Sequence, residues 1–198
     1  MMEVRVCSYK DNPIGNVINT TSRSENWSKG LSPFFLGPVQ LWGSHTSQNV
    51  ENAWQYSKVY PGFTDELGHP SKAWYDWACE GWSKSYAERY PLGKGKVPLY
   101  LNWDGHKLDY LTARRLVYCP LYACAVWNTD AFKKLQYMYH NGEGILWLKD
   151  FDGYDHKGLG LSYEAVLNSP RRKMGHAFVL AMLLENKRLW EKPETHND

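Results

Sequence analysis

An acid, an amide and a base share one side of a helix predicted within NVENAWQYSKVY, residues 49–60. With helical periodicity, Glu51, Gln55 and Lys58 follow one another at i, i+4 and i+7, and Trp54 lies on the neighbouring arc. A carboxylate held in this way could serve as a general base or stabilise a positively charged centre. The alternative is a solvated flank of an amphipathic helix, in which a contact between Glu51 and Gln55 contributes only roughly 0.2–0.5 kcal/mol.

A second group of polar side chains lies in the glycine-punctuated loop KDFDGYDHKGLG, residues 149–160. Asp150, Asp152 and Asp155 surround Tyr154 and offer oxygen ligands of the kind that Mg²⁺ or Ca²⁺ prefers. The spacing is not that of an EF-hand loop. An ordinary aspartate-rich turn is the favoured interpretation, ahead of a loop that lines a site, and a metal cage comes third.

A third group is basic and begins a helix predicted from Ser169 to Trp190, with Pro170 at its first position. Ser at the N-cap and Pro directly after it are typical of helix starts. Each cation in the first turn destabilises a helix by roughly 0.3–1 kcal/mol at exposed sites, because it lies at the positive end of the helix dipole. Together with the unpaired N–H groups of that turn, such cations would attract an anion. A solvated basic turn, or salt bridges to acidic neighbours such as Glu164, would explain the same residues. The three cations are Arg171, Arg172 and Lys173.

The elements that must position these groups are short and mixed. Alternation predicts a strand over residues 2–10, and two shorter strands are expected near residues 39–42 and at ILWL, residues 145–148. The apolar run from Ala177 to Leu184 predicts a buried central helix. Helical patterns also cover residues 47–61, 71–90, 106–118 and 129–140. Without the strand–helix alternation of a Rossmann fold, the chain is predicted to be α+β and mainly helical.

Length and composition restrict the function class. The 198 residues suffice for one sizeable domain, and a net charge of +2 argues against wholesale coating of nucleic acid. Ten Trp and fourteen Tyr are expected mostly in the core, with one or two left to stack on a planar ligand. The chain has no G-x-G-x-x-G, Walker A, H-E-x-x-H or G-x-S-x-G motif, which weighs against the corresponding redox enzymes, NTPases, proteases and esterases.

The expected compartment is the cytoplasm. The N-terminal residues lack the apolar core of a signal peptide, and no apolar run reaches the ~18 residues that a membrane span needs. The four cysteines show no C-x-x-C pair, so reduced thiols are the favoured interpretation. A soluble protein without a membrane partner is therefore predicted.

Four segments resemble, in order, the motifs of the NADAR family, whose members are N-glycosidases tied to NAD and ADP-ribose chemistry. Leu31, Ser32 and Phe34 match the LSNF-like opening segment of the family. Met174 and Gly175 match the Leu-Gly step that begins its last helix. The S-x-E-x-x-x-Q-x-x-K helix is matched by Glu51, Gln55 and Lys58, and the acidic loop by Asp152, Gly153, Tyr154 and Asp155.

The resemblance extends from about Gly30 to Leu184 and implies three regions. These are an N-terminal strand and loop at 1–29, a NADAR-like domain at 30–190 and a flexible tail at 191–198. Pro33 stands where the family usually has Asn, and Met182 where an Arg is expected, so the chain resembles a divergent branch.

The function that the resemblance implies is hydrolysis of an N-glycosidic bond in a ribosylated nucleotide. Glu51 is then the expected catalytic carboxylate, and Asp152 and Asp155 are second candidates for acid–base work. No metal and no cofactor are expected. The substrate is expected to be ADP-ribosylated guanine in nucleic acid, or a phosphoribosyl or ADP-ribose metabolite. Residues expected to bind it are Ser32, Phe34, Trp54, Gln55, Lys58, Tyr154, Arg171, Arg172, Lys173 and Gly175.

Two other functions stay open at this point. The first is a non-catalytic module that binds a modified nucleotide or nucleic acid with the same aromatic and basic groups. The second is an interaction protein whose aromatic side chains anchor a partner. Turnover by the unmodified protein, and its loss on Glu51→Gln, would distinguish an enzyme from both.

Overall fold

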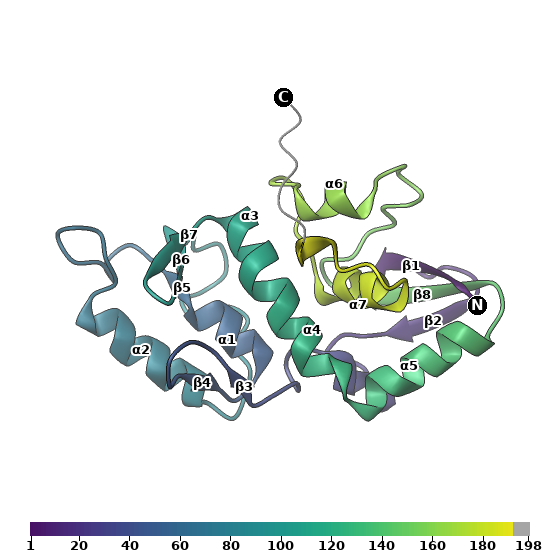
Figure 1. Cartoon of the computed structure of the whole chain (residues 1–198), viewed down its shortest axis with the longest axis horizontal. Helices are drawn as coiled ribbons and strands as arrows, with labels where there is room; N and C mark the ends of the chain where they lie inside the picture. The colour runs from purple at the N-terminus through teal and green to yellow at the C-terminus, as the bar shows by residue number, and fades with distance from the viewer. Residues whose placement is uncertain (192–198) are drawn as a thin grey trace. The chain divides into compact units, whose positions relative to one another are not determined.

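The computed structural model describes residues 1–191 (Figure 1). The chain forms two compact units. Residues 1–32 together with the chain from Arg114 onward make up one, here called the N/C unit, and Pro33–Ala113 make up the other, the middle unit. Residues 192–198, and with them nearly all of the predicted tail, lie outside the described residues.

A parallel sheet of three strands organises the N/C unit. The strands are β1 (Glu3–Ser8), β2 (Asn16–Asn19) and β8 (Ile145–Asp150), in the order β1-β8-β2. The central strand pairs in parallel with both neighbours, so all three carboxyl ends meet at one edge. The strands predicted over residues 2–10 and 145–148 are thus confirmed, the second being longer than expected.

Helices surround this sheet. The helix α7 (His176–Leu184) is buried along its whole length and packs against β1, β8 and α4 (Cys119–Trp127). The predicted central helix is therefore confirmed (Figure 1). The predicted helix at 129–140 is α5 (Asp130–Asn141), with Thr129 as its N-cap. The unit also contains α6 (Tyr163–Leu167) and the 3₁₀ turns η1 (Trp27–Leu31) and η3 (Leu189–Glu191).

The start of the last helix was predicted at Ser169 and is wrong. Residues 169–175 are not helical, and α7 begins only at His176, after Gly175 in an extended conformation. The cause is a competing partner for the backbone: the Arg114 guanidinium donates to the carbonyls of Leu167, Ser169 and Arg172. Those carbonyls are therefore satisfied by a side chain, and the segment stays a loop.

The helix predicted over residues 106–118 is only partly right. Its first residues form the strand β7 (His106–Leu108), followed by α3 (Tyr110–Ala113) in the middle unit. In the N/C unit the chain continues as the π-helical turn η2 (Arg114–Tyr118) and then as α4. Pro120 is tolerated because it lies in the first turn of α4, where a missing N–H costs little.

The middle unit contains α1 (Val50–Tyr56) and α2 (Lys72–Ser83). Its strands are β3 (Val39–Gln40) paired with β4 (Thr46–Ser47), and β5 (Lys58–Val59) and β6 (Tyr100–Trp103) in a sheet with β7. Both helices are shorter than the predicted 47–61 and 71–90. After Ser57 the chain leaves α1 because Lys58 and Val59 pair with β6.

Aromatic side chains fill the core of the middle unit, as their number in the sequence predicts. Tyr56, Val59, Trp74, Ala78 and Trp82 are buried together. The Trp74 indole donates to the carbonyl of Lys58 at 2.9 Å, which ties α2 to β5. Helices take up 37% and strands 16% of the described residues, and the predicted class, α+β and mainly helical, is confirmed.

Candidate functional site

The polar stripe on α1 is present and it is buried. The Asn49 side chain caps the helix by accepting from the backbone N–H of Asn52. Glu51 and Gln55 are 7% and 8% exposed. The Gln55 amide nitrogen donates to Glu51 Oε1 at 2.9 Å, and Lys58 Nζ donates to Gln55 Oε1 at 2.7 Å. The three side chains therefore form one chain of hydrogen bonds, and the solvated-flank interpretation does not describe them.

Lys58 takes part in this chain from outside the helix. It is the first residue of β5, and its ammonium lies 5.2 Å from the centre of the Trp54 ring. An ammonium over an indole face is attracted by the quadrupole of the ring. Trp54 and Gln55 thus hold Lys58 from two sides, which fixes a positive charge one amide away from the Glu51 carboxylate.

The segment of residues 33–36 lies against the first turn of α1. The carbonyl of Pro33 accepts from the Glu51 backbone N–H at 3.1 Å, and the carbonyl of Leu36 accepts from that of Val50 at 2.8 Å. These bonds satisfy two of the first N–H groups of the helix. Phe34, between the two acceptors, is half-buried.

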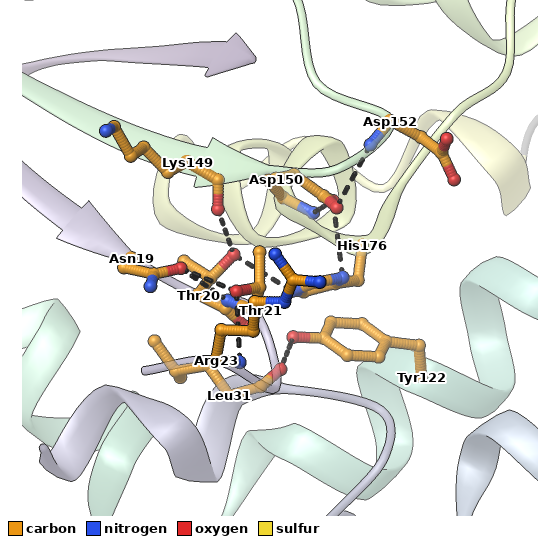
Figure 2. A network of polar contacts seen from close by, with 11 residues as sticks. Asn19, Thr20, Thr21, Arg23, Leu31, Tyr122, Lys149, Asp150, Asp152 and His176 are labelled. Atoms are coloured by element: carbon orange, nitrogen blue, oxygen red, sulfur yellow. Dashed lines mark hydrogen bonds and ion pairs between the residues drawn. The ribbon is translucent and has the colours of Figure 1, made fainter. Parts of the chain in front are cut away.

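A second polar network lies at the carboxyl edge of the parallel sheet (Figure 2). Asp150 ends β8, Thr20 follows β2 and His176 begins α7, and all three are buried. Asp150 Oδ2 lies 3.2 Å from His176 Nδ1, and His176 Nε2 lies 2.9 Å from Thr20 Oγ1. The order of acid, imidazole and hydroxyl is that of a nucleophilic triad.

The direction of the hydrogen bonds excludes nucleophile activation in this arrangement. His176 Nε2 is 2.8 Å from the carbonyl oxygen of Thr20, which can only accept, so Nε2 carries a proton. The Thr20 hydroxyl donates its own proton to the carbonyl of Lys149 at 2.8 Å. A protonated Nε2 cannot take a proton from Thr20. The network instead joins β2, β8 and α7 (Figure 2).

Asp150 also caps α7. Its Oδ2 accepts from the backbone N–H of Ala177 at 2.9 Å, while the N-cap residue itself, Gly175, has no side chain to offer. A Cβ at position 175 would overlap the Asp150 carboxylate. Gly175 is therefore required by the close approach of Asp150, and the helix end predicted to attract an anion already holds one.

The basic residues predicted in a first helical turn lie in the loop before α7, and all three are exposed. Arg172 is the best placed, with its guanidinium 4.8 Å from the centre of the Tyr154 ring. Arg114, which is 2% exposed, stabilises the loop. Its guanidinium donates to four carbonyls, those of Val166, Leu167, Ser169 and Arg172. Burial raises the pKa of Tyr154, against a smaller opposing effect of the two arginines.

The two aspartates of the acidic loop differ in their surroundings. Asp155 Oδ2 pairs with Arg5 at 3.1 Å, and its Oδ1 accepts from the backbone N–H of Gly158 at 3.0 Å. Both of its oxygens thus anchor the loop. Asp152 is half-buried, and its backbone N–H lies 3.4 Å from Asp150 Oδ1. Within residues 1–191, no group of three or more His, Cys, Asp or Glu side chains is arranged to hold a metal ion.

Sequence reasoning missed one cation at the sheet edge. Arg23, which is exposed, lies 5.7 Å from the ring centre of Tyr9 and 5.4 Å from that of Phe151. The two rings follow β1 and β8 and are 4.7 Å apart. The signal in the sequence is an aromatic residue directly after each of two strands, which places both rings at the same edge.

No family model, curated protein or solved structure matches this chain. Across the described part of the chain, no helix has the length and apolar character needed to cross a membrane.

The predicted site residues are distributed over both units. Those in the middle unit form the connected group around Glu51: Phe34, Glu51, Trp54, Gln55 and Lys58. In the N/C unit, Ser32 is buried at the end of η1, and its backbone N–H donates to the carbonyl of Lys29. The others there belong to the acidic loop or the segment before α7: Asp152, Tyr154, Asp155, Arg171, Arg172, Lys173 and Gly175.

Proposed function

We propose that this protein is an N-glycosidase that hydrolyses the bond between ribose and base in a ribosylated nucleotide, with Glu51 as the catalytic carboxylate. The observation that carries the proposal is the hydrogen-bonded chain from the buried Glu51 through the buried Gln55 to the half-buried Lys58. A carboxylate taken out of water needs partners, and here a neutral amide and a fixed ammonium supply them. A carboxylate held in one orientation can stabilise a cationic transition state, because its negative charge is already in position when the cation forms.

The reaction can be written with these residues. The bond from ribose C1′ to the base nitrogen breaks, its electron pair goes to the nitrogen, and positive charge develops on C1′ and the ring oxygen. The Glu51 carboxylate stabilises that charge and takes a proton from the water whose oxygen forms the new bond to C1′. The proton then passes to the released base or to solvent. Gln55 keeps the carboxylate in one orientation throughout.

Each unit, taken by itself, contains further candidates for binding a ribose or phosphate group. Lys58 is suited to a ribose hydroxyl or phosphate oxygen, since its ammonium is a positively charged hydrogen-bond donor and the Gln55 amide already orients it. In the N/C unit, Arg172 is the main candidate for phosphate, because its guanidinium is oriented by Tyr154 and has no ion-pair partner among residues 1–191. Arg171 and Lys173 would add charge. Asp152 is the second candidate carboxylate, and Asp155 acts by anchoring the loop.

The test is hydrolysis followed by chromatography and mass spectrometry. Full-length protein is incubated with an oligonucleotide carrying ADP-ribosylated guanine, and separately with ADP-ribose and phosphoribosyl adducts of small amines. Release of free ADP-ribose or ribose phosphate is expected. Glu51→Gln should reduce the rate by about 10²–10⁴-fold, the usual contribution of a general base. The exposed Glu164→Gln is the matched control and should leave the rate unchanged.

A binding module is the second candidate function. It is favoured by the exposed stack of Arg23 on Tyr9 and Phe151, which suits a phosphate or base and includes no acid–base group. In the contrary outcome, the unmodified protein turns over none of the substrates but still binds ADP-ribose, and that binding is lost on Arg23→Ala. This outcome would show that the hydrolase proposal is wrong and would support the binding module.

A further inference from the structure

A cavity of about 410 Å³ lies within the N/C unit, and none of the residues assigned above to the hydrolase lines it. Its walls come from the loop after the acidic turn, the start of α6 and the segment that follows α7. This volume is within the range of roughly 300–1,000 Å³ that small-molecule sites occupy. The residues used in the argument are His156, Lys157, Leu161, Tyr163, Lys187 and Leu189.

The walls of the cavity are held by the protein itself. The backbone N–H of Leu161 donates to the carbonyl of His156 at 2.8 Å, which closes the loop between them. On the other side, Arg115 donates to the side chain of Asn168 at 2.9 Å and to the carbonyl of Leu189 at 3.2 Å. The cavity is therefore formed before any ligand binds, so binding carries little cost of ordering the chain.

Asn186 directs a second lysine to the cavity. Glu185 ends α7, and Asn186 adopts the left-handed conformation with φ 54°, in which Asn is one of the few tolerated residues. The chain turns there, and the backbone N–H of Lys187 donates to the carbonyl of Met182 at 2.7 Å. Lys187 thus lies beside Lys157, which arrives from the opposite wall.

Two ammonium groups share one carboxylate at this point. Lys157 Nζ lies 2.6 Å from Glu185 Oε1, and Lys187 Nζ lies 2.8 Å from Glu185 Oε2. Burial opposes ionisation of Glu185, but the hydrogen bonds from both lysines outweigh it and hold the pKa of this carboxyl below its usual value. Both ammonium groups also lie within 6 Å of the Tyr163 ring centre, at 5.8 and 5.5 Å. The trio therefore carries one uncompensated positive charge.

Apart from Glu164, the rest of the lining is apolar or uncharged. Leu161 and Leu189 are half-buried, and Tyr163 presents its ring, which packs 4.6 Å from that of His156. His156 is 1% exposed, and its Nδ1 has no hydrogen-bond partner among the described residues. Because burial lowers the pKa of His156 to about 4, its ring is uncharged at neutral pH. Glu164 also lines the cavity but is exposed, so its charge is largely screened.

We infer that this cavity binds a small organic anion, one with a carboxylate or phosphate head and a short apolar body. The head pairs with the ammonium groups of Lys157 and Lys187, and the body lies against Leu161 and Leu189. The site is separate from the proposed hydrolase residues, so its occupation does not depend on Glu51.

The test compares three probes that share a six-carbon chain and differ in the charge of the head group: hexanoate, 1-hexanol and hexylammonium. Each is titrated into ¹⁵N-labelled full-length protein, and amide shifts are followed by NMR. Hexanoate should give saturable shifts at Leu161, Tyr163 and Lys187. Hexanol should bind at least fivefold more weakly at the same residues, and hexylammonium should not bind. Equal shifts from hexanoate and hexylammonium, or hexanoate shifts confined to other residues, would overturn the inference.

Lysine variants distinguish the contribution of the ammonium charge to binding from that of the apolar cavity wall. Lys187→Met is at an exposed position and should lower hexanoate affinity at least fivefold without changing that of hexanol. Lys10→Met, an exposed lysine of the same unit, is the control and should change neither. If Lys187→Met leaves hexanoate affinity unchanged while its melting temperature matches the parent protein, the anion assignment is wrong.

Discussion

Gln55 joins Glu51 to Lys58, because its amide nitrogen donates to the carboxylate at 2.9 Å and its amide oxygen accepts from the ammonium at 2.7 Å. The Gln55 amide thus orients the Glu51 carboxylate and holds the Lys58 ammonium. The two bonds also determine which end of the amide faces each partner, since an ammonium cannot accept and a carboxylate cannot donate. The stripe therefore acts as one unit.

The first prediction concerns this amide. Gln55→Met keeps the length of the side chain and removes both hydrogen bonds. A buried carboxylate that loses a partner costs about 1–3 kcal/mol, so the variant should unfold at lower urea concentration. Under the proposed function, kcat should fall more than tenfold with little change in KM, because orientation is lost rather than substrate contact. Gln40→Met, at an exposed position, is the control. Unchanged kcat in a folded variant would remove Gln55 from the mechanism.

The second prediction separates structure from catalysis at the sheet edge. Asp150→Asn weakens both the contact with His176 and the cap on α7, and buried polar groups that lose a partner typically cost about 1–3 kcal/mol. Thr20→Val should cost about 1–3 kcal/mol, because it leaves His176 without one of its acceptors. Chemical denaturation measures both values. A nucleophilic Thr20 would instead show as complete loss of turnover in a Thr20→Val protein that remains folded.

Lys58 was expected on the same helix as Glu51 and Gln55 and lies on β5 instead. The pairing of Glu51 with Gln55 was predictable because it depends on local periodicity, which the sequence displays directly. The same holds for β1, α5 and the buried run of α7. The start of α7 was not predictable, because Arg114, more than fifty residues upstream of Ser169, takes the carbonyls that a helix would have used. Local signals at Ser169 and Pro170 favour a helix, and a distant guanidinium overrides them.

The polar network at the carboxyl edge of the parallel sheet was also not predictable from the sequence. Asp150, His176 and Thr20 come from three distant segments, and only the parallel pairing of β8 with β2 brings Thr20 and Asp150 to one edge. Nothing in the residue types at Tyr9 or Phe151 indicates Arg23 as their common partner. Contacts between segments far apart in the chain depend on register and topology, which a single sequence does not display.

The third prediction tests the packing of Gly175. Gly175→Ala should destabilise the protein by about 1–3 kcal/mol, because the new Cβ overlaps the Asp150 carboxylate. The backbone at 175 is extended, so alanine itself is not strained there. The shorter side chain of Asp150→Ser should relieve the overlap, and the double variant should be less destabilised than the sum of the single ones. Additive free energies of unfolding would show that the two positions do not meet.

The fourth prediction concerns the dependence of stability on pH. Burial, with a smaller contribution from the charge of Lys157, lowers the pKa of His156 to about 4 in the folded protein, against an ordinary value of 6.5. Between these two values the unfolded chain binds more protons, so stability must rise with pH there and fall as the pH is lowered. The contribution of His156 is fully present above about pH 6.5, and roughly 2 kcal/mol of it should be lost by pH 5.

Urea unfolding at pH 7, 6 and 5 measures this effect. His156→Phe retains an aromatic ring of similar size and cannot be protonated, so its free energy of unfolding should change less over this interval than that of the parent protein. His106→Phe, at an exposed position on β7, is the control and should retain the full slope. Glu185, whose pKa lies below its usual 4.5, releases its stabilisation only at lower pH and does not contribute between pH 7 and 5. A parent protein with no slope in this interval would show that His156 is reached by water and protonated in the folded state.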